Sequence, residues 1–293
     1  MISPSQSMRK HGKTFYWASR FLEKEIANRF YAVYQFCRNI DDLVDEKKDK
    51  DTLKNIIQTW KKKKDHKIFD SFKSLEPRLV PQEHLLKEFF NGQSFDIYQK
   101  QPKTLNELII YCYRVAGVVG LMLCDVMELK NKTLRYYAID LGIAMQLTNI
   151  ARDIYEDANN NRIYIPETMI GKVSPEKLIN PSVEQKRKIN HARDKLIDLA
   201  EHYYQSANVG IQFLPKQTQR TIFIAAHLYR EIGIKIKINC ISYDEPRVFL
   251  TKYEKIIKTI KFLFKKQRVI SNIPQHNYLL HKAIHKLPEA NNV

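Results

Sequence analysis

The chain has 293 residues, of which 44% are hydrophobic and 28% are charged. This length and balance suit one globular domain, and the presence of only 8 Gly and 11 Pro disfavours a turn-rich all-β fold. The formal net charge of +17 attracts polyanions, a class that includes nucleic acid, anionic lipid and diphosphates. Because aromatic and basic residues do not interleave, and no zinc, RNP-like or helix-turn-helix motif occurs, no nucleic-acid partner is expected.

The predicted elements are all helices, because apolar residues recur at helical spacing between prolines and polar clusters. We predict an all-α fold, a single-domain bundle over residues 1–293 with a central cavity and short flexible ends near 1–8 and 287–293. The predicted helices span 20–46, 51–64, 82–99, 104–128, 131–158, 183–209, 216–239, 246–267 and 275–286, and the clearest loop is 159–161.

Neither the N-terminus nor the cysteines indicate export. The first 13 residues, MISPSQSMRKHGK, are not followed by an apolar segment, so no secretory signal is expected. The four cysteines form no C-x-x-C pair, which argues against a disulfide framework or a zinc site. The longest apolar stretch, 115–127, contains Asp125 and is shorter than the roughly 20 residues that cross a bilayer. We expect a cytoplasmic chain without a membrane span, which leaves peripheral attachment open.

A first acidic cluster lies near the end of the first long predicted helix, in YAVYQFCRNIDDLVDE, Tyr31–Glu46. Asp41 and Asp45 are four residues apart, so their carboxylates share one helix face, and Arg38 precedes Asp41 by three on that face. Two such carboxylates can share Mg²⁺, which prefers oxygen ligands and commonly bridges carboxylates to substrate phosphates. Taken alone, the cluster is more readily explained by a solvated helix end.

A second, matching cluster lies in LGIAMQLTNIARDIYEDANNNRIYIP, Leu141–Pro166. Gln146, Asn149, Asp153 and Asp157 follow one another by three, four and four residues and form one polar stripe on an otherwise apolar helix. Because buried carboxylates need partners or metal ions, the stripe predicts a polar site inside the bundle. Two helices with such aspartates could hold magnesium ions that stabilise a departing diphosphate.

Aromatic residues near these stripes could shield a carbocation from water, although for any single one of them ordinary core packing is the stronger explanation. They are Phe15, Tyr31, Tyr34, Phe36, Tyr111 and Tyr113.

Four segments together resemble the successive motifs of the squalene and phytoene synthase family: HGKTFYWASRFL, YAVYQFCRNIDDLVDE, YCYRVAGVVGLM and LGIAMQLTNIARDIYEDANNNRIYIP. They stand in the family's order. The resemblance extends over roughly residues 9 to 260, because two later segments, LAEHYYQSANVGIQFLP and AAHLYREIG, also resemble the family. The branch of the family that the sequence resembles most is the bacterial phytoene synthases.

The resemblance implies an isoprenoid synthase fold and a head-to-head condensation of two prenyl diphosphates through a cyclopropylcarbinyl diphosphate. In phytoene synthases the substrate is geranylgeranyl diphosphate, and the product enters carotenoid biosynthesis. The implied cofactor is Mg²⁺, which Mn²⁺ could replace, and no nicotinamide cofactor is expected.

Carried onto matching positions, the resemblance implies roles for individual residues. The implied metal ligands are Asp41, Asp45, Asn149, Asp153 and Asp157. The residues that would contact diphosphate or support those ligands are Arg38, Gln146, Asn149 and Arg152. Lys13 would reach diphosphate from an N-terminal flap. Tyr113, Tyr229 and Arg247 match positions that line the cavity or approach the leaving group, and Phe15 matches an aromatic near the substrate chain. The four aspartates, Arg38 and Tyr113 would form the catalytic set.

The sequence departs from the family pattern in two places. Asn161 stands where many members have Gly before Arg162; because Asn tolerates a left-handed backbone, we expect little effect. The usual E-G-M-x-x-D segment appears as NGQSFD, Asn91–Asp96, which keeps Gly92 and Asp96 but loses an acid, and this bears on chain-length selectivity.

Two other kinds of function remain open at this stage. Squalene, dehydrosqualene and presqualene diphosphate synthases act on farnesyl diphosphate and share both aspartate clusters; reduction to squalene needs a nicotinamide donor, and no G-x-G-x-x-G motif is present. A non-catalytic assembly relative would usually lose the aspartates, which all stand here at the expected spacing.

Peripheral membrane attachment follows from the long prenyl chains of the implied substrate and product. We expect a basic face to rest on anionic lipid, with the Lys-rich segment 47–67 as its candidate. The sequence specifies no oligomeric state.

Overall fold

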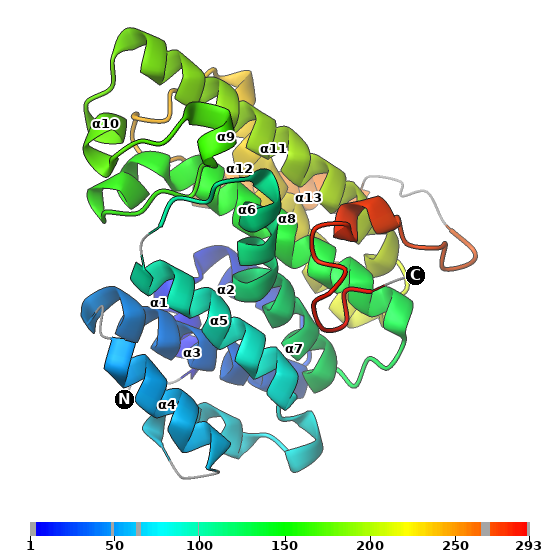
Figure 1. Cartoon of the computed structure of the whole chain (residues 1–293). Helices are drawn as coiled ribbons and strands as arrows, with labels where there is room; N and C mark the ends of the chain where they lie inside the picture. The colour runs from blue at the N-terminus through cyan, green and yellow to red at the C-terminus, as the bar shows by residue number, and fades with distance from the viewer. Residues whose placement is uncertain (1–3, 48–49, 63–65, 99, 265–269, 292–293) are drawn as a thin grey trace.

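The predicted all-α fold is confirmed. The computed structural model describes residues 4–47, 50–62, 66–98, 100–264 and 270–291, and these residues form helices and turns but no strand (Figure 1). The α-helices are α1 Pro4–His11, α2 Lys13–Ser19, α3 Lys24–Lys47, α4 Lys50–Lys61, α5 Glu83–Tyr98, α6 Leu105–Cys112, α7 Val118–Val126, α8 Lys132–Asn159, α9 Glu167–Ile170, α10 Pro175–Ile179, α11 Val183–Ile211, α12 Lys216–Ile238 and α13 Lys252–Phe264. The 3₁₀ turns are η1 Lys67–Ser74, η2 Pro77–Leu79 and η4 Tyr278–His281, and η3 Tyr113–Gly117 is a π-helical turn between α6 and α7.

The two longest helices, α8 and α11, pack along each other and form the centre of the bundle (Figure 1). The Asn131 side chain starts α8 by accepting a hydrogen bond from the Leu134 N–H, and Ser182 starts α11 in the same way through Gln185. α7, η3 and α12 also pack on α8, while α3 packs on α1, α5, α7 and η1. The polar stripe of α8 therefore lies inside the bundle, as its spacing predicts.

Two glycines allow the backbone of α8 to contact the backbones of η3 and α7 directly. A Cβ atom added to Gly142 of α8 would lie 2.3 Å from the carbonyl oxygen of Ala116, and one added to Gly120 of α7 would lie 2.5 Å from that of Ala138. Both distances are far below van der Waals contact, and the atoms met belong to backbone. The packing of α8 against its neighbours therefore requires a residue without a Cβ atom, that is glycine, at both positions.

Several predicted boundaries need correction. Residues before α3 form two short helices that the apolar spacing did not predict, and α13 begins at Lys252 rather than at 246. The predicted helix 275–286 is wrong: that segment forms the 3₁₀ turn η4 followed by further turns, and its His276 and His281 side chains are buried. Within the ends expected to be flexible, the described residues Ser7, Met8 and Ala290 are buried.

One helical stretch, Leu105–Val126, is long and apolar enough to cross a membrane by length and composition, so the expectation that no stretch would qualify was too strict. In the fold, 56% of its most apolar window is buried against other helices. The core helix of a globular protein meets the same criteria.

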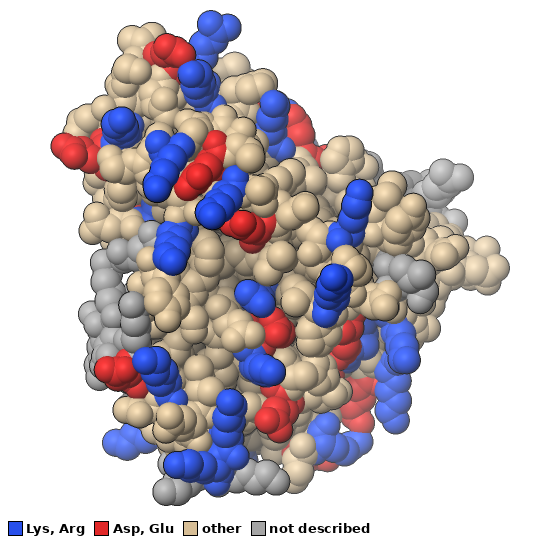
Figure 2. Space-filling model, in the orientation of Figure 1, with Lys and Arg blue, Asp and Glu red and all other residues tan. Residues whose placement is uncertain are grey.

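On the face shown in Figure 2, Lys and Arg side chains are scattered among Asp and Glu. Duplex binding commonly uses a basic stripe or patch on one face.

The approach of α8 to η3 gives a first prediction. We expect Gly142→Ala to lower the free energy of unfolding by about 1–3 kcal/mol, because the new methyl group must displace backbone. Denaturant unfolding measures the change. Gly233→Ala on α12 is the matched control, since the nearest atom to its Cβ outside its own helix would be a side-chain atom, Cγ2 of Ile197, at 3.1 Å. An equal loss in both variants would contradict the argument.

Candidate active site

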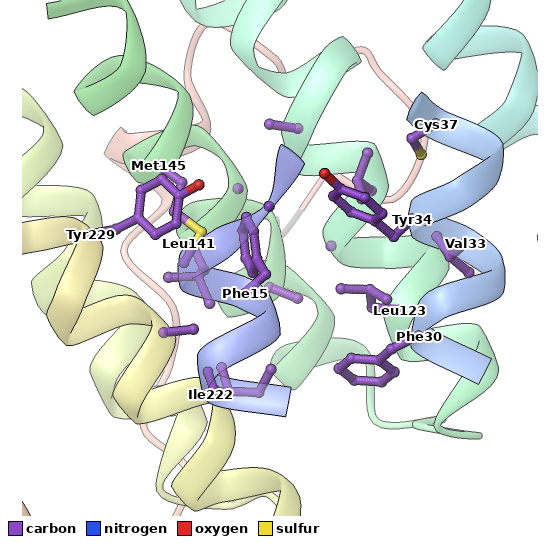
Figure 3. Close-up of a pocket in the computed structure, with 18 of the residues that line it drawn as sticks. Phe15, Phe30, Val33, Tyr34, Cys37, Leu123, Leu141, Met145, Ile222 and Tyr229 are labelled. Carbon is purple, nitrogen blue, oxygen red and sulfur yellow. The ribbon is translucent and has the colours of Figure 1, made fainter. Parts of the chain in front are cut away.

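A cavity of about 410 Å³ lies between α2, α3, α7, α8 and α12. Figure 3 shows Phe15 of α2 in its middle, with Tyr229, Met145 and Leu141 on one side and Tyr34, Val33, Phe30 and Leu123 on the other. The Phe15 and Tyr229 rings are 5.0 Å apart, so α2 and α12 meet across the cavity. The predicted central cavity is thus present, and both aromatic residues line it.

The cavity lining changes from apolar to polar along the helices that form it. On α3, Phe30 and Val33 precede Arg38 and Asp41; on α8, Leu134, Ala138 and Leu141 precede Gln146, Asn149 and Arg152; on α12, Ile222 and Ala225 precede Tyr229. Arg247, from the connection after α12, also lines the cavity. An apolar body with ionic groups at one end matches a ligand that has a hydrocarbon chain and an anionic head.

Asp41 is held at the polar end by a neighbour that the sequence analysis did not single out. The Gln93 amide of α5 donates a hydrogen bond of 2.7 Å to Asp41 Oδ1. Gln93 belongs to NGQSFD, so the only sequence signal was the departure of that segment from the family pattern. Arg38 lines the cavity and is ion-paired with Asp42 one turn away.

The remainder of NGQSFD has a packing role. Asp96 is buried and accepts hydrogen bonds from the Tyr111 hydroxyl, at 2.9 Å, and the Tyr164 hydroxyl, at 2.6 Å. The Tyr111 and Tyr164 rings stack with centroids 5.0 Å apart. This buried group ties α5 to α6 and to the segment after α8, close to the second aspartate cluster.

Asp153 lies between two arginines. Arg152 Nε donates to Asp153 Oδ1 at 2.7 Å, and Arg247 Nη2 donates to Asp153 Oδ2 at 2.9 Å. The backbone at Asp153 leaves helical geometry, with φ −105° and ψ 15°, and this kink turns the final part of α8. Arg152 and Arg247 both line the cavity, so they place the ion-paired carboxylate at its polar end.

Beyond the kink, Asp157 leaves the cavity. It faces a small pocket with Arg162 and Tyr164 instead of the main cavity. Burial, and then the nearby carboxylate of Asp153, raise the pKa of Asp157 well above its usual value. Along the polar stripe predicted from sequence, Gln146 and Asn149 line the cavity, whereas Asp153 is paired with two arginines that line it. Asp157 is turned away from the cavity.

Asn149 carries an orphaned oxygen. Its Oδ1 is buried and has no hydrogen-bond partner, although the residue lines the cavity. A buried polar atom without a partner is unfavourable unless a ligand satisfies it. The donors at this end are amide and carboxylate oxygens, the ligand type that Mg²⁺ prefers, so the residues present fit a magnesium ion. Asp153 could join them if an ion competed with Arg152 and Arg247 for its carboxylate.

The remaining predicted residues have different placements. Lys13 is exposed at the start of α2, and partial burial together with the charge of Lys13 lowers the pKa of Lys255 on α13. Asp45 lies on α3, but its side chain is outside the part of the structure that is described. Tyr113 is not brought to the cavity: it is fully buried in η3, and its hydroxyl donates to the carbonyl of Pro288.

The loop after α8 agrees with its prediction. Asn161 has a left-handed backbone with φ 61°, the conformation that Asn tolerates in place of Gly.

Comparisons with known proteins agree with this site. Residues 8–254 match the sequence model of the squalene/phytoene synthase family. The chain is 31% identical over 242 residues to a 15-cis-phytoene synthase of Enterobacter agglomerans, with 76% of this chain and 81% of that protein covered. It is 30% identical over 271 residues to a phytoene synthase of Pseudescherichia vulneris, with 86% and 87% covered. A solved dehydrosqualene synthase, bound to a ligand, has a TM-score of 0.76 and 27% identity, with 88% of this chain and 93% of that chain covered.

The helical bundle encloses an apolar cavity with arginines and carboxylates at one end, and such a cavity suits isoprenoid diphosphates. The comparisons define the class of the protein as a prenyltransferase. The chain belongs to the squalene/phytoene synthase family. The reaction of this family is a head-to-head prenyl condensation, and its members generally use Mg²⁺.

The raised pKa of Asp157 gives a second prediction. The pKa of Asp157 in the folded protein lies above its value of about 3.9 in the unfolded chain. The stabilising contribution of Asp157 is therefore complete below about pH 3.9 and is lost as the pH rises through the folded-state pKa. We expect Asp157→Asn to raise the free energy of unfolding at pH 7 by about 1 kcal/mol, and by less near pH 4. Denaturant unfolding at both pH values measures the difference. Glu176→Gln, an exposed carboxylate on α10, should change little, and a less stable Asp157→Asn variant at pH 7 would contradict the assignment.

Proposed function

We propose that the protein condenses two molecules of geranylgeranyl diphosphate head to head into phytoene, the first committed step of carotenoid biosynthesis. The observation that carries the proposal is the cavity whose lining changes from apolar to ionic along α3, α8 and α12. The curated relatives at about 30% identity that bear the name phytoene synthase favour the C20 substrate.

The reaction begins when the allylic C–O bond of one substrate breaks and the diphosphate leaves with the electron pair. The double bond of the second substrate then attacks the carbocation, and loss of a proton closes a cyclopropane ring. A second loss of diphosphate, rearrangement and proton loss give the C40 hydrocarbon. Each charge-separating step needs the developing diphosphate charge to be stabilised and the carbocation to be kept from water.

The chain's own residues supply both requirements. Arg38, Arg152 and Arg247 are the cations at the polar end, where a diphosphate would lie. Asp41 and Asn149, with Asp153 beside them, would hold the magnesium ions, which supply further positive charge to the leaving group. Phe15, Tyr34 and Tyr229 present aromatic faces to the cavity, in agreement with a role in shielding the cation.

The second candidate is a C30 synthase acting on farnesyl diphosphate. It is favoured by the structural match to a dehydrosqualene synthase at 27% identity. The two candidates share the ionic end of the cavity and differ in the length of chain that its apolar part accepts.

A product assay separates these functions. Purified protein with Mg²⁺ receives geranylgeranyl diphosphate or farnesyl diphosphate, each with and without a nicotinamide donor, and the hydrocarbons are identified by mass spectrometry. We expect phytoene from the C20 substrate without the donor, and a loss of roughly 100-fold or more in Asp41→Ala. The control is Asp51→Ala, an exposed carboxylate on α4, which should keep full activity. Preferred C30 products would select the second candidate, and no turnover with either substrate would indicate a non-catalytic relative.

We further propose that the protein is cytoplasmic and rests on anionic lipid through α13. The side chains of Tyr253, Ile256, Ile257, Ile260, Leu263 and Phe264 are exposed by 41% to 86%. At 3.6 residues per turn these six positions fall within about one third of the helix circumference and form an outward apolar stripe. Thr259 and Phe262 face inward, and Phe262 stacks on His227 of α12.

Charge supports lipid as the partner of this stripe. Lys252 and Lys261 are exposed on α13 beside the apolar residues, a pattern that suits anionic headgroups around buried side chains. Parts of the candidate segment named from sequence, 47–67, lie outside the described residues. In its described part α4 is less suitable, because its apolar residues Leu53 and Ile56 are buried in the core. We therefore replace that segment with α13.

Vesicle flotation tests this surface. We expect the protein to float with vesicles of phosphatidylcholine and phosphatidylserine, and the double variant Ile260→Glu, Phe264→Glu to remain in the dense fractions, because two carboxylates would face anionic lipid. Val183→Glu is the matched control, since Val183 is a single exposed apolar residue, 89% accessible, on α11. Equal flotation of both variants, or no flotation of the parent protein, would contradict the proposal.

A further inference from the structure

The C-terminal segment 270–291 runs beside α8 and α11 with little regular structure (Figure 1). It is held by side chains that donate to its backbone carbonyls: Tyr137 of α8 donates to Pro274, and Tyr203 of α11 donates to Leu280. A segment without helical hydrogen bonds depends on such cross-links for its position.

Three side chains of types that can bind metal ions meet where this segment crosses α8. Asp140, His276 and His281 are 0%, 4% and 0% exposed, and one ligand atom from each lies within 4.8 Å of the others. His276 Nε2 is 2.6 Å from Asp140 Oδ2, and His281 Nε2 is 3.0 Å from Asp140 Oδ1. Asp140 does not line the main cavity although its neighbour Leu141 does, so the cluster lies outside the candidate active site.

The hydrogen bonds of His281 require a positive charge at this place. Its Nδ1 lies 3.0 Å from the carbonyl oxygen of Ala290, which can only accept, so Nδ1 carries a hydrogen and donates it. Its Nε2 faces a carboxylate oxygen, which also accepts when ionised. Two lone pairs would otherwise oppose each other, so Nε2 and Asp140 need either an additional proton or a metal ion between them.

The hydrogen bonds around the cluster resemble those that surround the ligands of metal sites. Metal-binding histidines commonly donate their other ring N–H to a backbone carbonyl, as His281 does to Ala290. The ligating carboxylate is commonly hydrogen-bonded as well, and Ser206 Oγ donates to Asp140 Oδ2 at 2.6 Å. These contacts fix the orientation of both ligands without occupying His281 Nε2.

We propose that Asp140, His276 and His281 bind a divalent transition-metal ion of the zinc type, which fastens the C-terminal segment to α8. Two imidazoles and one carboxylate suit zinc, whereas Mg²⁺ prefers oxygen ligands throughout, so this site differs in chemistry from the polar end of the cavity. A tetrahedral zinc ion sets neighbouring ligand atoms about 3.3 Å apart. The His276–Asp140 contact, now 2.6 Å, would therefore lengthen by about 0.7 Å, and the His281–Asp140 contact, now 3.0 Å, by about 0.3 Å.

The fastened segment positions other parts of the fold. Its Pro288 carbonyl accepts the hydrogen bond of Tyr113, and its Glu289 is ion-paired with Arg135 of α8. The inference is independent of the proposed prenyl condensation, since Asp140, His276 and His281 do not line the main cavity.

Metal content and thermal unfolding test the proposal. The full-length protein is treated with a chelator, dialysed, and titrated with Zn²⁺ or with Mg²⁺ at the same concentrations. We expect about one Zn²⁺ per chain by mass spectrometry after renewed dialysis, and a rise in Tm of roughly 5 °C with Zn²⁺ at 100 times its Kd. Mg²⁺ should not reproduce the rise. Co²⁺ bound at this site should show the visible absorption of a tetrahedral ion.

Variants locate the ion. His281→Gln should lose the bound Zn²⁺ and the rise in Tm, while His285→Gln, an exposed histidine of the same segment, should keep both. If His281→Gln fails to fold, the Co²⁺ absorption of the parent protein and its loss in His276→Gln decide the question. No retained Zn²⁺ in the parent protein, or equal retention in His281→Gln and His285→Gln, would overturn the proposal and leave a proton as the charge between His281 and Asp140.

Discussion

Carboxylates at the end of an apolar cavity need positive charge close by, and much of this structure follows from that requirement. Asp153 is paired with Arg152 and Arg247. Asp41 accepts a hydrogen bond from the uncharged amide of Gln93 and interacts electrostatically with Arg38. Asn149 Oδ1 is left without a partner. The polar end thus combines cations with oxygen atoms that could bind further cations. Such an arrangement suits a magnesium diphosphate, because metal ions and arginines then share its charge.

α8 contributes residues both to the cavity and to the contact with the C-terminal segment. Leu141 and Met145 line the cavity, while the neighbouring Asp140 faces the C-terminal segment. The absence of a side chain at Gly142 lets η3 approach the helix, so the cavity wall is formed by closely packed backbone. A change in the position of α8 would therefore affect the polar end, the cavity and the attachment of the C-terminal segment together.

Much of the fold and site could be predicted because helical spacing is a local property. The placement of Gln146 and Asn149 in the cavity and the left-handed backbone of Asn161 follow from residue type and interval. The kink at Asp153 has no such signal, and it carries Asp157 away from the cavity. Tyr113 was misplaced because its hydroxyl direction depends on Pro288, a residue far along the chain. The histidines near Asp140 lie more than 130 positions from it, so spacing could not bring them together.

The central claim is that the diphosphate binds where Asp41, Asn149 and Arg152 line the cavity, with the prenyl chain in its apolar part. A crystal structure with Mn²⁺ and an unreactive thiolodiphosphate analogue of the C20 substrate tests this most directly, because Mn²⁺ is located by its anomalous signal. The account predicts Mn²⁺ beside Asn149 Oδ1 and the aspartates, and a prenyl chain that passes Phe15 toward Phe30 and Leu134. Mn²⁺ bound away from these oxygens, or a diphosphate at the apolar end, would contradict it.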